Sequence, residues 1–434
     1  MTIPEIRKLD GGVFEGGRLH DAIPALPVKE PILCRLAGRD GKGNAAKIAL
    51  DAEIFSRHLC FLGGIGTGKT NAIFQVVRQL RQSLGQDDVM VIFDTKGDFH
   101  ERFYQGGDVV IANDNGLDGV TDRWNIFAEI DRSTPAHQSE SIFEIAETLF
   151  YEKIHASKEP FFPNAAKDLF AAILLHFCRS DHLPQNNAAL KAYLDGSPID
   201  LLREMLGCYD DLRAMQTYIA EGSQQGNGVF SELQQLSRRI FVSNFAEAGN
   251  LSMRRLVREK RGKVVFVEYD IGCANMLTPV YRLLFDMAIK QSLSRRRSKG
   301  NVWFVIDEFR LLPHLQYIEN AVNFGRSLGV KFIIGVQNIS QVDEAYSGLA
   351  ASILSGFSTN FVFRLTDRAS KDYVQGVFDR NRKAEIYKGG NAQIVEHIRE
   401  AHVVEDWDIA QLALGECIAG VGGSAAFRFG WERA

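Results

Sequence analysis

The sequence lacks the features that mark secreted, membrane-spanning and zinc-built proteins. Its six cysteines include no CxxC pair and its ten histidines form no HExxH motif, so neither a disulfide framework nor a zinc site is indicated. The most apolar windows, VWFVI and KFIIGV, span five or six residues, far below the ~20 that a membrane helix needs. The opening MTIPEIRKLDGG has no apolar run typical of a signal peptide. We therefore expect a cytoplasmic chain whose cysteines are reduced.

A strong net charge is also missing. The formal charge is −4 at pH 7, which argues against nonspecific coating of nucleic acid by the whole surface but leaves room for a local basic channel. Three basic clusters occur at residues 253–263, 293–300 and 379–390. Their plain interpretation is solvated helix ends. In a ring-shaped assembly, one or more of them could line a pore and follow a phosphate backbone without reading bases.

Short apolar runs rich in β-branched and aromatic residues are what the sequence has in quantity. They lie at residues 58–62, 89–93, 108–112, 263–269, 302–306, 331–336 and 360–365. Continuous apolar runs with helical patterns between them indicate a mostly parallel sheet that is covered on both faces. The predicted fold class is therefore α/β.

The hydrophobic pattern changes between residues 133 and 245. Apolar residues there recur at helical spacing, as in Ile142, Ile145 and Leu149. We predict an all-α domain at 133–245 inserted in an α/β domain made of 57–132 and 246–434. Residues 1–56, which contain no transmembrane helix, are interpreted as a lead-in segment rather than a separate domain.

The stretch GGIGTGKT fits the phosphate-binding pattern G-x-x-x-x-G-K-[ST]. It follows an apolar strand and precedes an amphipathic helix, which is the context that this loop requires. Glycines let backbone N–H groups turn toward phosphate oxygens at a helix N-terminus. The predicted nucleotide-binding residues are Gly63, Gly64, Gly66, Thr67, Gly68, Lys69 and Thr70. Lys69 is expected to reach the β- and γ-phosphates of ATP, and the Thr70 hydroxyl to bind Mg²⁺.

Two aspartates follow apolar strands and compete for the role beside Mg²⁺. Only Asp307 is followed by a second carboxylate, Glu308, and a hydrolytic site needs one acid for the metal and another to activate water. We assign Asp307 to the metal and Glu308 to the general base. Asp94 is then left on an adjacent strand, near the nucleotide, with a less defined binding role.

Two further residues have open assignments on spacing alone. Gln337 ends the strand after the acidic pair, where it is either a γ-phosphate sensor or an ordinary loop residue. Arg326 is either a cation at a helix C-terminus or an arginine finger that reaches the nucleotide of a neighbouring subunit.

The order of these parts resembles the TraG/TraD-like coupling proteins of conjugation and type IV secretion, in the FtsK/HerA branch of P-loop motor ATPases. The resemblance runs from about residue 45 to about 420. It is carried by RHLCFLGGIGTGKT, VIFDTKGDFHERF, DRWNIFAEI, EPFFPNAAKDLFAAIL, VWFVIDEFRLLP, NFGRSLGVKFIIGVQNISQV and ILSGFSTNFVFRLTD.

This resemblance implies a RecA-like domain interrupted by an all-α domain, and a homo-hexamer with ATP and Mg²⁺ at subunit interfaces, monomeric in dilute solution without ligand. It implies that Lys69, Glu308 and Gln337 serve catalysis and that Arg326 acts in trans. The implied partners are single-stranded DNA bound without sequence preference, a relaxase or effector proteins, and inner-membrane components of the secretion system.

The chain departs from the typical pattern at two points. Typical members begin with membrane-spanning helices, whereas this chain has none, so it is expected to dock on the membrane through a partner or to have a cytosolic task. Thr95 stands where the family often has Pro. The alternatives are a cytosolic FtsK/HerA-type DNA translocase for DNA processing or defence, a protein-cargo secretion ATPase, and a nucleotide-gated scaffold.

Overall fold

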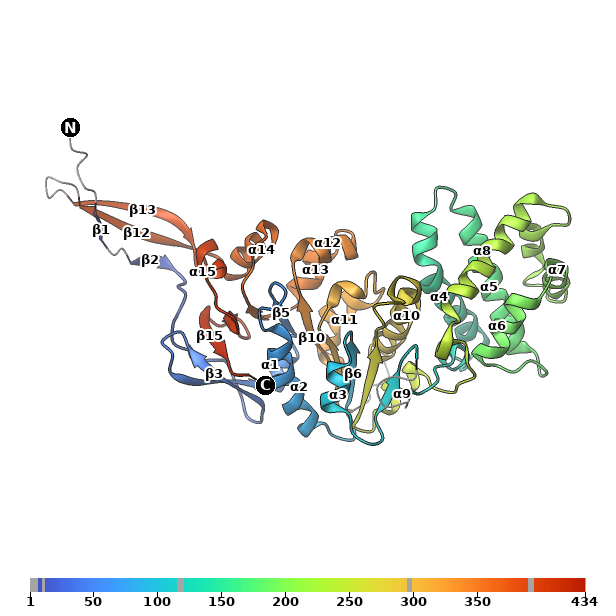
Figure 1. Ribbon diagram of the computed structural model, residues 1–434, viewed down its shortest axis with the longest axis horizontal. Coiled ribbons are helices and arrows are strands. Elements are labelled where there is room, and N and C mark those ends of the chain that lie inside the picture. Colours follow the sequence, from blue (N-terminus) through green and yellow to red (C-terminus); the bar gives the residue numbers. More distant parts are fainter. Residues whose placement is uncertain (1–6, 10–11, 115–120, 295–298, 389–393, 434) are drawn as a thin grey trace. The chain divides into compact units, whose positions relative to one another are not determined.

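The computed structural model describes residues 7–9, 12–114, 121–294, 299–388 and 394–433 (Figure 1). The chain folds as two compact units. The first consists of Met1–Leu84, Trp303–Pro313 and Glu319–Ala434, and the second of Gly85–Val302 and His314–Ile318.

The first unit is built on a mixed sheet. In spatial order its strands are β4 (Ala45–Asp51), β3 (Ile32–Asp40), β15 (Phe427–Trp431), β14 (Glu416–Gly420), β11 (Thr359–Val362), β5 (Leu59–Leu62), β10 (Val330–Val336) and β9 (Val302–Ile306). Strands β11, β5 and β10 run parallel. From β11 outward, β14, β15, β3 and β4 follow one another, and each is antiparallel to its neighbours. The carboxyl ends of the parallel strands therefore meet at one edge of the sheet.

Helices and aromatic contacts complete this unit. Its helices are α1 (Ala52–Phe55), α2 (Lys69–Ser83), α11 (Ile318–Phe324), α12 (Ile339–Tyr346), α13 (Ala350–Ser355), α14 (Arg368–Phe378) and α15 (Asp406–Ala410), with 3₁₀ turns η4 (Phe309–Leu311) and η5 (Gly325–Leu328). Helix α2 packs against β3, β5 and β10. In the core, the rings of Phe61 and Phe361 stack with centroids 4.9 Å apart, and Trp431 approaches Phe361 at 5.1 Å. These contacts join the parallel and antiparallel parts of the sheet.

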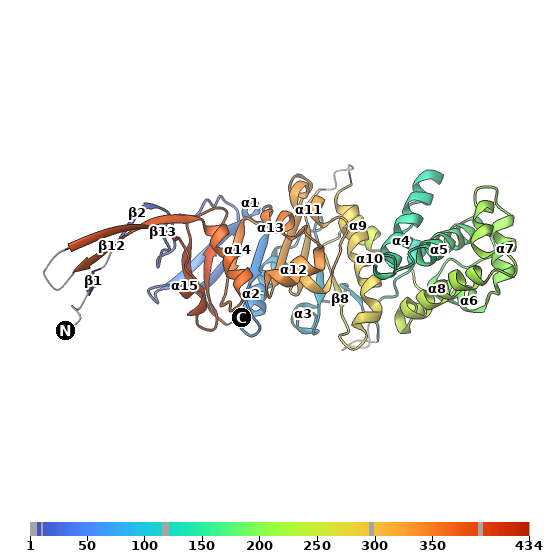
Figure 2. The same ribbon diagram turned by 90° about the horizontal axis from the view of Figure 1, so that it is seen from above.

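A second, wholly antiparallel sheet belongs to the same unit. It is made of β1 (Arg7–Leu9), β2 (Val13–Gly16), β12 (Arg380–Lys388) and β13 (Ile394–His402), and Figures 1 and 2 show β12 and β13 as a long pair extending away from α15. The basic cluster at 379–390 is thus mainly a strand, and its interpretation as a helix end was wrong; residues 389–390 lie outside the described residues. Arg380 and Arg382 pair with Glu400 and Glu15 at 3.6 and 3.3 Å.

The second unit combines three parallel strands with a run of helices. The strands β6 (Val89–Asp94), β8 (Lys263–Glu268) and β7 (Val109–Ile111) pair in that order. The helices are α3 (Asp98–Phe103), α4 (Pro135–Ala156), α5 (Phe161–Arg179), α6 (Asn187–Gly196), α7 (Ile199–Gly207), α8 (Gln224–Ile240), α9 (Met253–Glu259) and α10 (Ala274–Ser292), with η1 (Ile126–Glu129), η2 (Arg213–Ile219) and η3 (Ser243–Ala246). Every regular element between residues 133 and 245 is helical. The division of the chain into domains at these boundaries stays a prediction.

The seven strands expected from apolar runs are confirmed as β5 to β11. The sequence analysis missed β3, β4, β14 and β15. In β3, β4 and β15 the cause is an antiparallel strand with a partly exposed face, which carries a weaker apolar signal. In β3, for example, buried positions alternate with more exposed ones. Residues 32–51 therefore extend the sheet and are more than a lead-in. Among the described helices, none combines the length and the hydropathy that crossing a bilayer requires.

A buried ionisable group in the second unit allows the packing around it to be tested. Asp286 on α10 is fully buried and its carboxylate accepts a hydrogen bond of 2.9 Å from the backbone N–H of Gln316. One helical turn away, the buried Arg282 pairs with Glu152 at 2.8 Å. Burial raises the pKa of Asp286 to about 8, because a charged carboxylate is costly in a medium of low polarity.

The pKa of Asp286 predicts a pH dependence of stability. Below pH ~4 the carboxyl is neutral in both states, and above that the unfolded chain ionises while the folded chain keeps its proton. The free energy of unfolding should therefore fall by up to about 1.4 kcal/mol per pH unit until pH reaches about 8. Asp286→Asn should flatten this slope between pH 5 and 8 in urea titrations. The exposed Asp343→Asn should leave the slope unchanged, and equal slopes for wild type and Asp286→Asn would contradict the prediction.

Candidate functional site

The phosphate-binding pattern forms the connection between β5 and α2 in the first unit. The backbone N–H of Gly63 donates to the Val336 carbonyl and that of Gly64 to the Arg364 carbonyl, each at 3.0 Å. Gly66 and Gly68 have φ of +71° and +110°, a region that glycine enters without strain. A Cβ atom on Gly63 would lie 2.6 Å from Cβ of Phe363. The neighbouring strands thus fix where the loop begins, and glycine is required there.

Lys69, the first residue of α2, has its ammonium inside this loop. The side chain is 8% exposed, and Nζ donates to the carbonyl oxygens of Gly63 at 2.5 Å and Gly64 at 3.0 Å. The Thr67 hydroxyl also donates to the Gly64 carbonyl, at 2.8 Å. A nearly buried cation beside the N-terminus of α2 fits a polyphosphate, because both the cation and the helix end attract negative charge.

The hydroxyl of the second residue of α2 meets the carboxylate of the residue that follows β9. The Thr70 hydroxyl donates to Oδ2 of Asp307 at 2.7 Å. Both groups offer oxygen atoms, which are the ligands that Mg²⁺ prefers, and Mg²⁺ keeps several waters in such sites. The donor set therefore fits a hydrated magnesium ion. The described residues contain no cluster of three or more His, Cys, Asp or Glu side chains that could hold a metal without such water.

Glu308 and Gln337 also lie together. The Gln337 amide donates to Oε2 of Glu308 at 2.5 Å, and Arg310 Nε donates to Oε1 at 3.1 Å. Gln337 directly follows β10 and Glu308 follows Asp307 after β9, so the ends of adjacent strands bring the two side chains into contact. The sequence analysis placed both residues at strand ends, and the structure joins them.

Arg326 lies at the opposite edge of the sheet. It belongs to η5, which precedes β10, whereas the phosphate loop follows β5, and Val336 at the end of β10 is paired with Leu62. Because β10 has seven residues and a strand advances about 3.3 Å per residue, Arg326 is on the order of 20 Å from the loop. Its side chain is 52% exposed and lies 3.4 Å from Glu53. Arg326 therefore cannot reach the phosphate loop of its own chain.

Asp94, predicted to bind the nucleotide, belongs to the second unit and has local partners. Its carboxylate accepts hydrogen bonds from the backbone N–H groups of Lys96 at 3.3 Å, Phe99 at 3.0 Å and His100 at 2.8 Å. Burial raises the pKa of Asp94, and these backbone donors oppose the rise. The carboxylate thus holds the first turn of α3, and its role toward a nucleotide stays a prediction.

The sequence analysis missed contacts from the C-terminal strands to the phosphate loop. The backbone N–H of Gly415 donates to the Thr67 carbonyl at 3.1 Å. The Glu432 carbonyl accepts from the side-chain amides of Asn71 at 2.9 Å and Gln75 at 2.5 Å, both on α2. No sequence pattern marks these bonds, because they join residues far apart in the chain. Gly415, with φ of +81°, is the one local signal of a tight turn.

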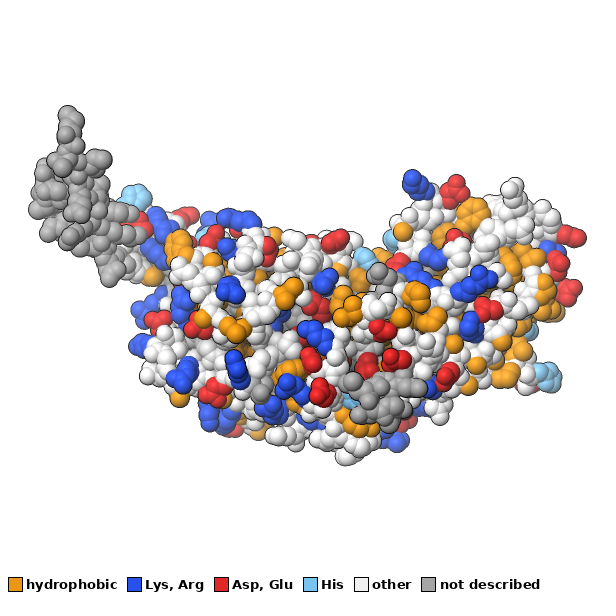
Figure 3. Space-filling model, viewed as in Figure 1, with side chains coloured by type: hydrophobic (Ala, Val, Ile, Leu, Met, Phe, Trp, Pro, Cys, Tyr) orange, Lys and Arg blue, Asp and Glu red, His pale blue; other side chains and the backbone are white. Residues whose placement is uncertain are grey.

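On the face displayed in Figure 3, the described residues show no continuous basic surface. Lys and Arg side chains there are interspersed with Asp and Glu. The cluster at 253–263 comprises α9 and the turn after it, and residues 295–298 of the second cluster lie outside the described residues. On this face, therefore, basic and acidic side chains are mixed.

Residues 42–399 match the profile of the family described as the type IV secretion-system coupling protein DNA-binding domain. The chain belongs to this family. The match extends over more than half of the 434 residues, and it confirms the resemblance that the sequence motifs carried.

Curated relatives come from conjugation and type IV secretion. The chain is 22% identical over 364 residues to the coupling protein TraD of Escherichia coli K12, which covers 79% of this chain and 47% of TraD. It is 23% identical to the VirD4 coupling protein of Bartonella quintana, over 70% of this chain and 50% of VirD4. The chain thus spans about half the length of the curated relatives it matches.

Solved structures of the coupling-protein family share the fold. The unbound bacterial conjugative coupling protein TrwBΔN70 superposes with a TM-score of 0.73 at 18% identity, covering 89% of this chain and 87% of that one. TrwB in complex with ADP and Mg²⁺ gives a TM-score of 0.72 at 17% identity, covering 99% and 96%. The predicted α/β class, a RecA-like domain with a mostly parallel sheet, is confirmed.

The close packing around Gly63 predicts that alanine lowers the thermal stability at Gly63 more than at Gly64. Gly63→Ala places Cβ against Phe363, and overpacking of this kind typically costs about 1–3 kcal/mol, so thermal unfolding of the nucleotide-free chain should shift to lower temperature. Gly64→Ala is the matched control, because its Cβ would lie 3.6 Å from the nearest atom. Equal melting temperatures for the two variants would contradict the packing described here.

Proposed function

We propose that this chain is the ATP-hydrolysing part of a conjugation or type IV secretion coupling protein, which binds DNA and drives or licenses its transfer to the secretion channel. The observation that carries the proposal is the grouping of Lys69, the Thr70–Asp307 pair and the Glu308–Gln337 pair at one edge of one sheet. Membership of the coupling-protein family supports the DNA and secretion part of the proposal.

Each residue of this edge has a proposed role. Lys69 binds the β- and γ-phosphates of ATP, and Thr70 and Asp307 hold Mg²⁺, which when bound neutralises charge on the phosphate oxygens. Glu308 orients and deprotonates the attacking water. Gln337, through its bond to Glu308, reports the presence of the γ-phosphate. TrwB binds ADP with Mg²⁺ and a non-hydrolysable ATP analogue, which supports ATP and Mg²⁺ as the ligands here.

The position of Arg326 supports an assembly. Since the side chain is on the order of 20 Å from its own phosphate loop, we propose that it completes the site of a neighbouring copy in a homo-hexamer. The proposed cargo is single-stranded DNA delivered with a relaxase, or effector proteins. The proposed place of action is the cytoplasmic face of the inner membrane, where secretion components hold the chain.

The first experiment is a steady-state ATPase assay with and without single-stranded DNA, across protein concentrations and at two salt levels. We expect DNA to stimulate the rate at least severalfold, with a cooperative dependence on protein and a loss at high salt, since phosphate contacts weaken with salt. Glu308→Gln should bind ATP without turning it over and serves as the control for contaminating ATPase. A rate that ignores DNA and is linear in protein would favour a protein-cargo ATPase or a scaffold instead.

The trans role of Arg326 is tested by mixing two inactive variants. Arg326→Ala should keep ATP affinity and lose about 10³-fold in turnover, as other arginine fingers do, and Lys69→Ala should lose ATP binding. In mixed assemblies, the intact Lys69 site of one variant meets the intact Arg326 of the other, so part of the activity should return. No recovery at any mixing ratio would support the plain helix-end role. Arg310→Ala mixed with Lys69→Ala is the control. Because Arg310 contacts Glu308 of its own chain, mixing should not restore activity.

A further inference from the structure

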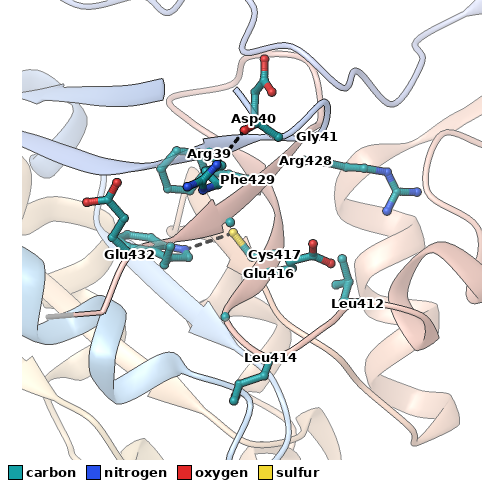
Figure 4. A pocket seen from close by; sticks show the side chains of 14 residues that line it. Arg39, Asp40, Gly41, Leu412, Leu414, Glu416, Cys417, Arg428, Phe429 and Glu432 are labelled. Atoms are coloured by element: carbon teal, nitrogen blue, oxygen red, sulfur yellow. Dashed lines mark hydrogen bonds between the residues drawn. The ribbon is translucent and has the colours of Figure 1, made fainter. Parts of the chain in front are cut away.

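Arginines near the candidate site differ in what they contact. Figure 4 shows two of them, Arg39 and Arg428, in a pocket of about 530 Å³ between β3, β15 and the segment before β14. Arg39 donates to the Gly43 carbonyl at 3.1 Å, and Arg428 pairs with Asp408 at 2.6 Å. Both therefore have local partners that take no part in the proposed chemistry. Arg310 instead contacts the proposed general base.

Arg310 and Gln337 hold the two oxygens of one carboxylate. Arg310 lies in η4, two residues after Glu308. Its Nε donates to Oε1 of Glu308 at 3.1 Å, while the Gln337 amide donates to Oε2 at 2.5 Å. Each oxygen of the carboxylate therefore has its own donor, and the two donors come from the connections that follow two different strands, β9 and β10.

The turn that carries Arg310 is anchored on both sides. Phe309 is fully buried, and its ring stacks on that of Tyr346 with centroids 4.9 Å apart and an interplanar angle of 8°. The Tyr346 hydroxyl donates at 2.5 Å to the carbonyl oxygen of Leu312, whose side chain is also fully buried. Arg310 thus leaves the protein surface from a fixed point, because the residues around it are held in the core.

Both donors to Glu308 depend on helix α12. Gln337 lies two residues before the helix begins at Ile339, and Tyr346 is the last residue of the helix. Gln337 contacts Glu308 directly, whereas Tyr346 acts on it through η4 and Arg310. One helix therefore sets the position of both donors relative to the carboxylate.

The pair of Arg310 and Glu308 orients a side chain more than it stabilises the fold. The two side chains are 40% and 17% exposed, and ion pairs that reach the solvent contribute little to stability. The last torsion of a glutamate side chain is broad, so a carboxylate with one donor can still turn about it. A second, charge-assisted donor on the other oxygen removes that freedom.

Two donors leave Glu308 able to act as a general base. An ionised carboxylate has about four lone-pair sites, and the contacts from Arg310 and Gln337 occupy two of them. The carboxylate can therefore still accept a hydrogen bond from water. Its orientation matters for the rate, because a misplacement of about 1 Å in a catalytic site can cost about 10²-fold.

We propose that Arg310 is a positioning residue, whose guanidinium acts together with the Gln337 amide to orient the Glu308 carboxylate toward the attacking water. In this role Arg310 contacts neither the nucleotide nor the water and acts only through Glu308. The inference rests on the proposed function, since it takes Glu308 as the general base. It adds a residue that lies outside the phosphate loop, the acidic pair and the strand-end glutamine.

The test separates turnover from nucleotide binding. Arg310→Met keeps the apolar stem of the side chain and removes its charge and its donors. We expect kcat of ATP hydrolysis to fall about 10- to 100-fold, whereas the dissociation constant of Mg²⁺-ADP, measured by isothermal titration calorimetry, should change less than about twofold. The melting temperature should stay close to that of wild type, because the pair is exposed to solvent.

Two further variants complete the test. Arg310→Lys should recover part of kcat, since an ammonium supplies charge and donors but not the planar fork of a guanidinium. Arg368→Met is the matched control, because Arg368 is a 75% exposed arginine of α14 that pairs with Asp372 at 2.9 Å. It should match wild type in both turnover and ADP binding.

Other outcomes overturn the positioning role. An unchanged kcat in Arg310→Met would mean that Gln337 alone orients Glu308. A raised kcat would mean that Arg310 restrains Glu308 rather than positioning it. A loss of ADP affinity in step with kcat would mean that the substitution disturbs the site as a whole. No recovery in Arg310→Lys would mean that a charge at this position is not what orients the carboxylate.

Failure of the inference and failure of the proposed function give different results. If only the inference fails, Glu308→Gln is inactive while Arg310→Met turns over ATP as wild type does. If Glu308→Gln hydrolyses ATP at the wild-type rate, or wild type does not hydrolyse ATP at all, the proposed function fails, and the positioning role fails with it.

Discussion

The parallel pairing of β5 with β10 is the constraint on which the candidate site depends. The register aligns Leu59 with Ile333 and Leu62 with Val336, so both strands end at the same level of the sheet. The phosphate loop leaves from the first strand and Gln337 from the second. The Gly63 N–H then donates to the Val336 carbonyl, and this bond continues the pairing into the loop. A shift of one residue would turn the side chains of β10 to the opposite faces and separate these groups.

Close backbone packing between the end of β10 and Asp307 fixes the position of the acidic pair relative to β10. A Cβ atom on Gly335, near the end of β10, would lie 2.0 Å from the Asp307 carbonyl oxygen, so only glycine lets this part of the two strands approach. The approach places Glu308 within hydrogen-bond distance of Gln337. It also leaves the Asp307 carboxylate beside the Thr70 hydroxyl. The polar contacts of the site therefore depend on backbone fit as much as on side-chain chemistry.

These dependencies explain which parts of the molecule could be predicted. The phosphate loop and the acidic pair are local patterns attached to strands that are buried on both faces, and such strands have a strong apolar signal. Strands β3, β14 and β15 pair antiparallel, and the bond from Gly415 to Thr67 joins distant residues. The alternating residues of β3 and β15 give a weaker signal than a continuous apolar run, and no sequence pattern shows which residue Gly415 bonds to. For Asp94, the sequence showed a carboxylate at a strand end but not the backbone donors of α3 that it accepts from.

The proposed function requires an assembly, because the site and Arg326 lie at opposite edges of the same sheet. The carboxyl edge of the sheet carries the loop, the acids and Gln337, whereas Arg326 lies at the amino edge, beside the 70% exposed Phe324. The partner of Arg326, Glu53, also binds Lys29 and Arg57, and ion pairs this exposed contribute little to stability. In the proposed assembly, Arg326 would exchange Glu53 for a phosphate of another copy at small cost, because Lys29 and Arg57 would still neutralise Glu53. A site whose cation comes from a second chain turns over only where two chains meet, so hydrolysis would be confined to assembled protein.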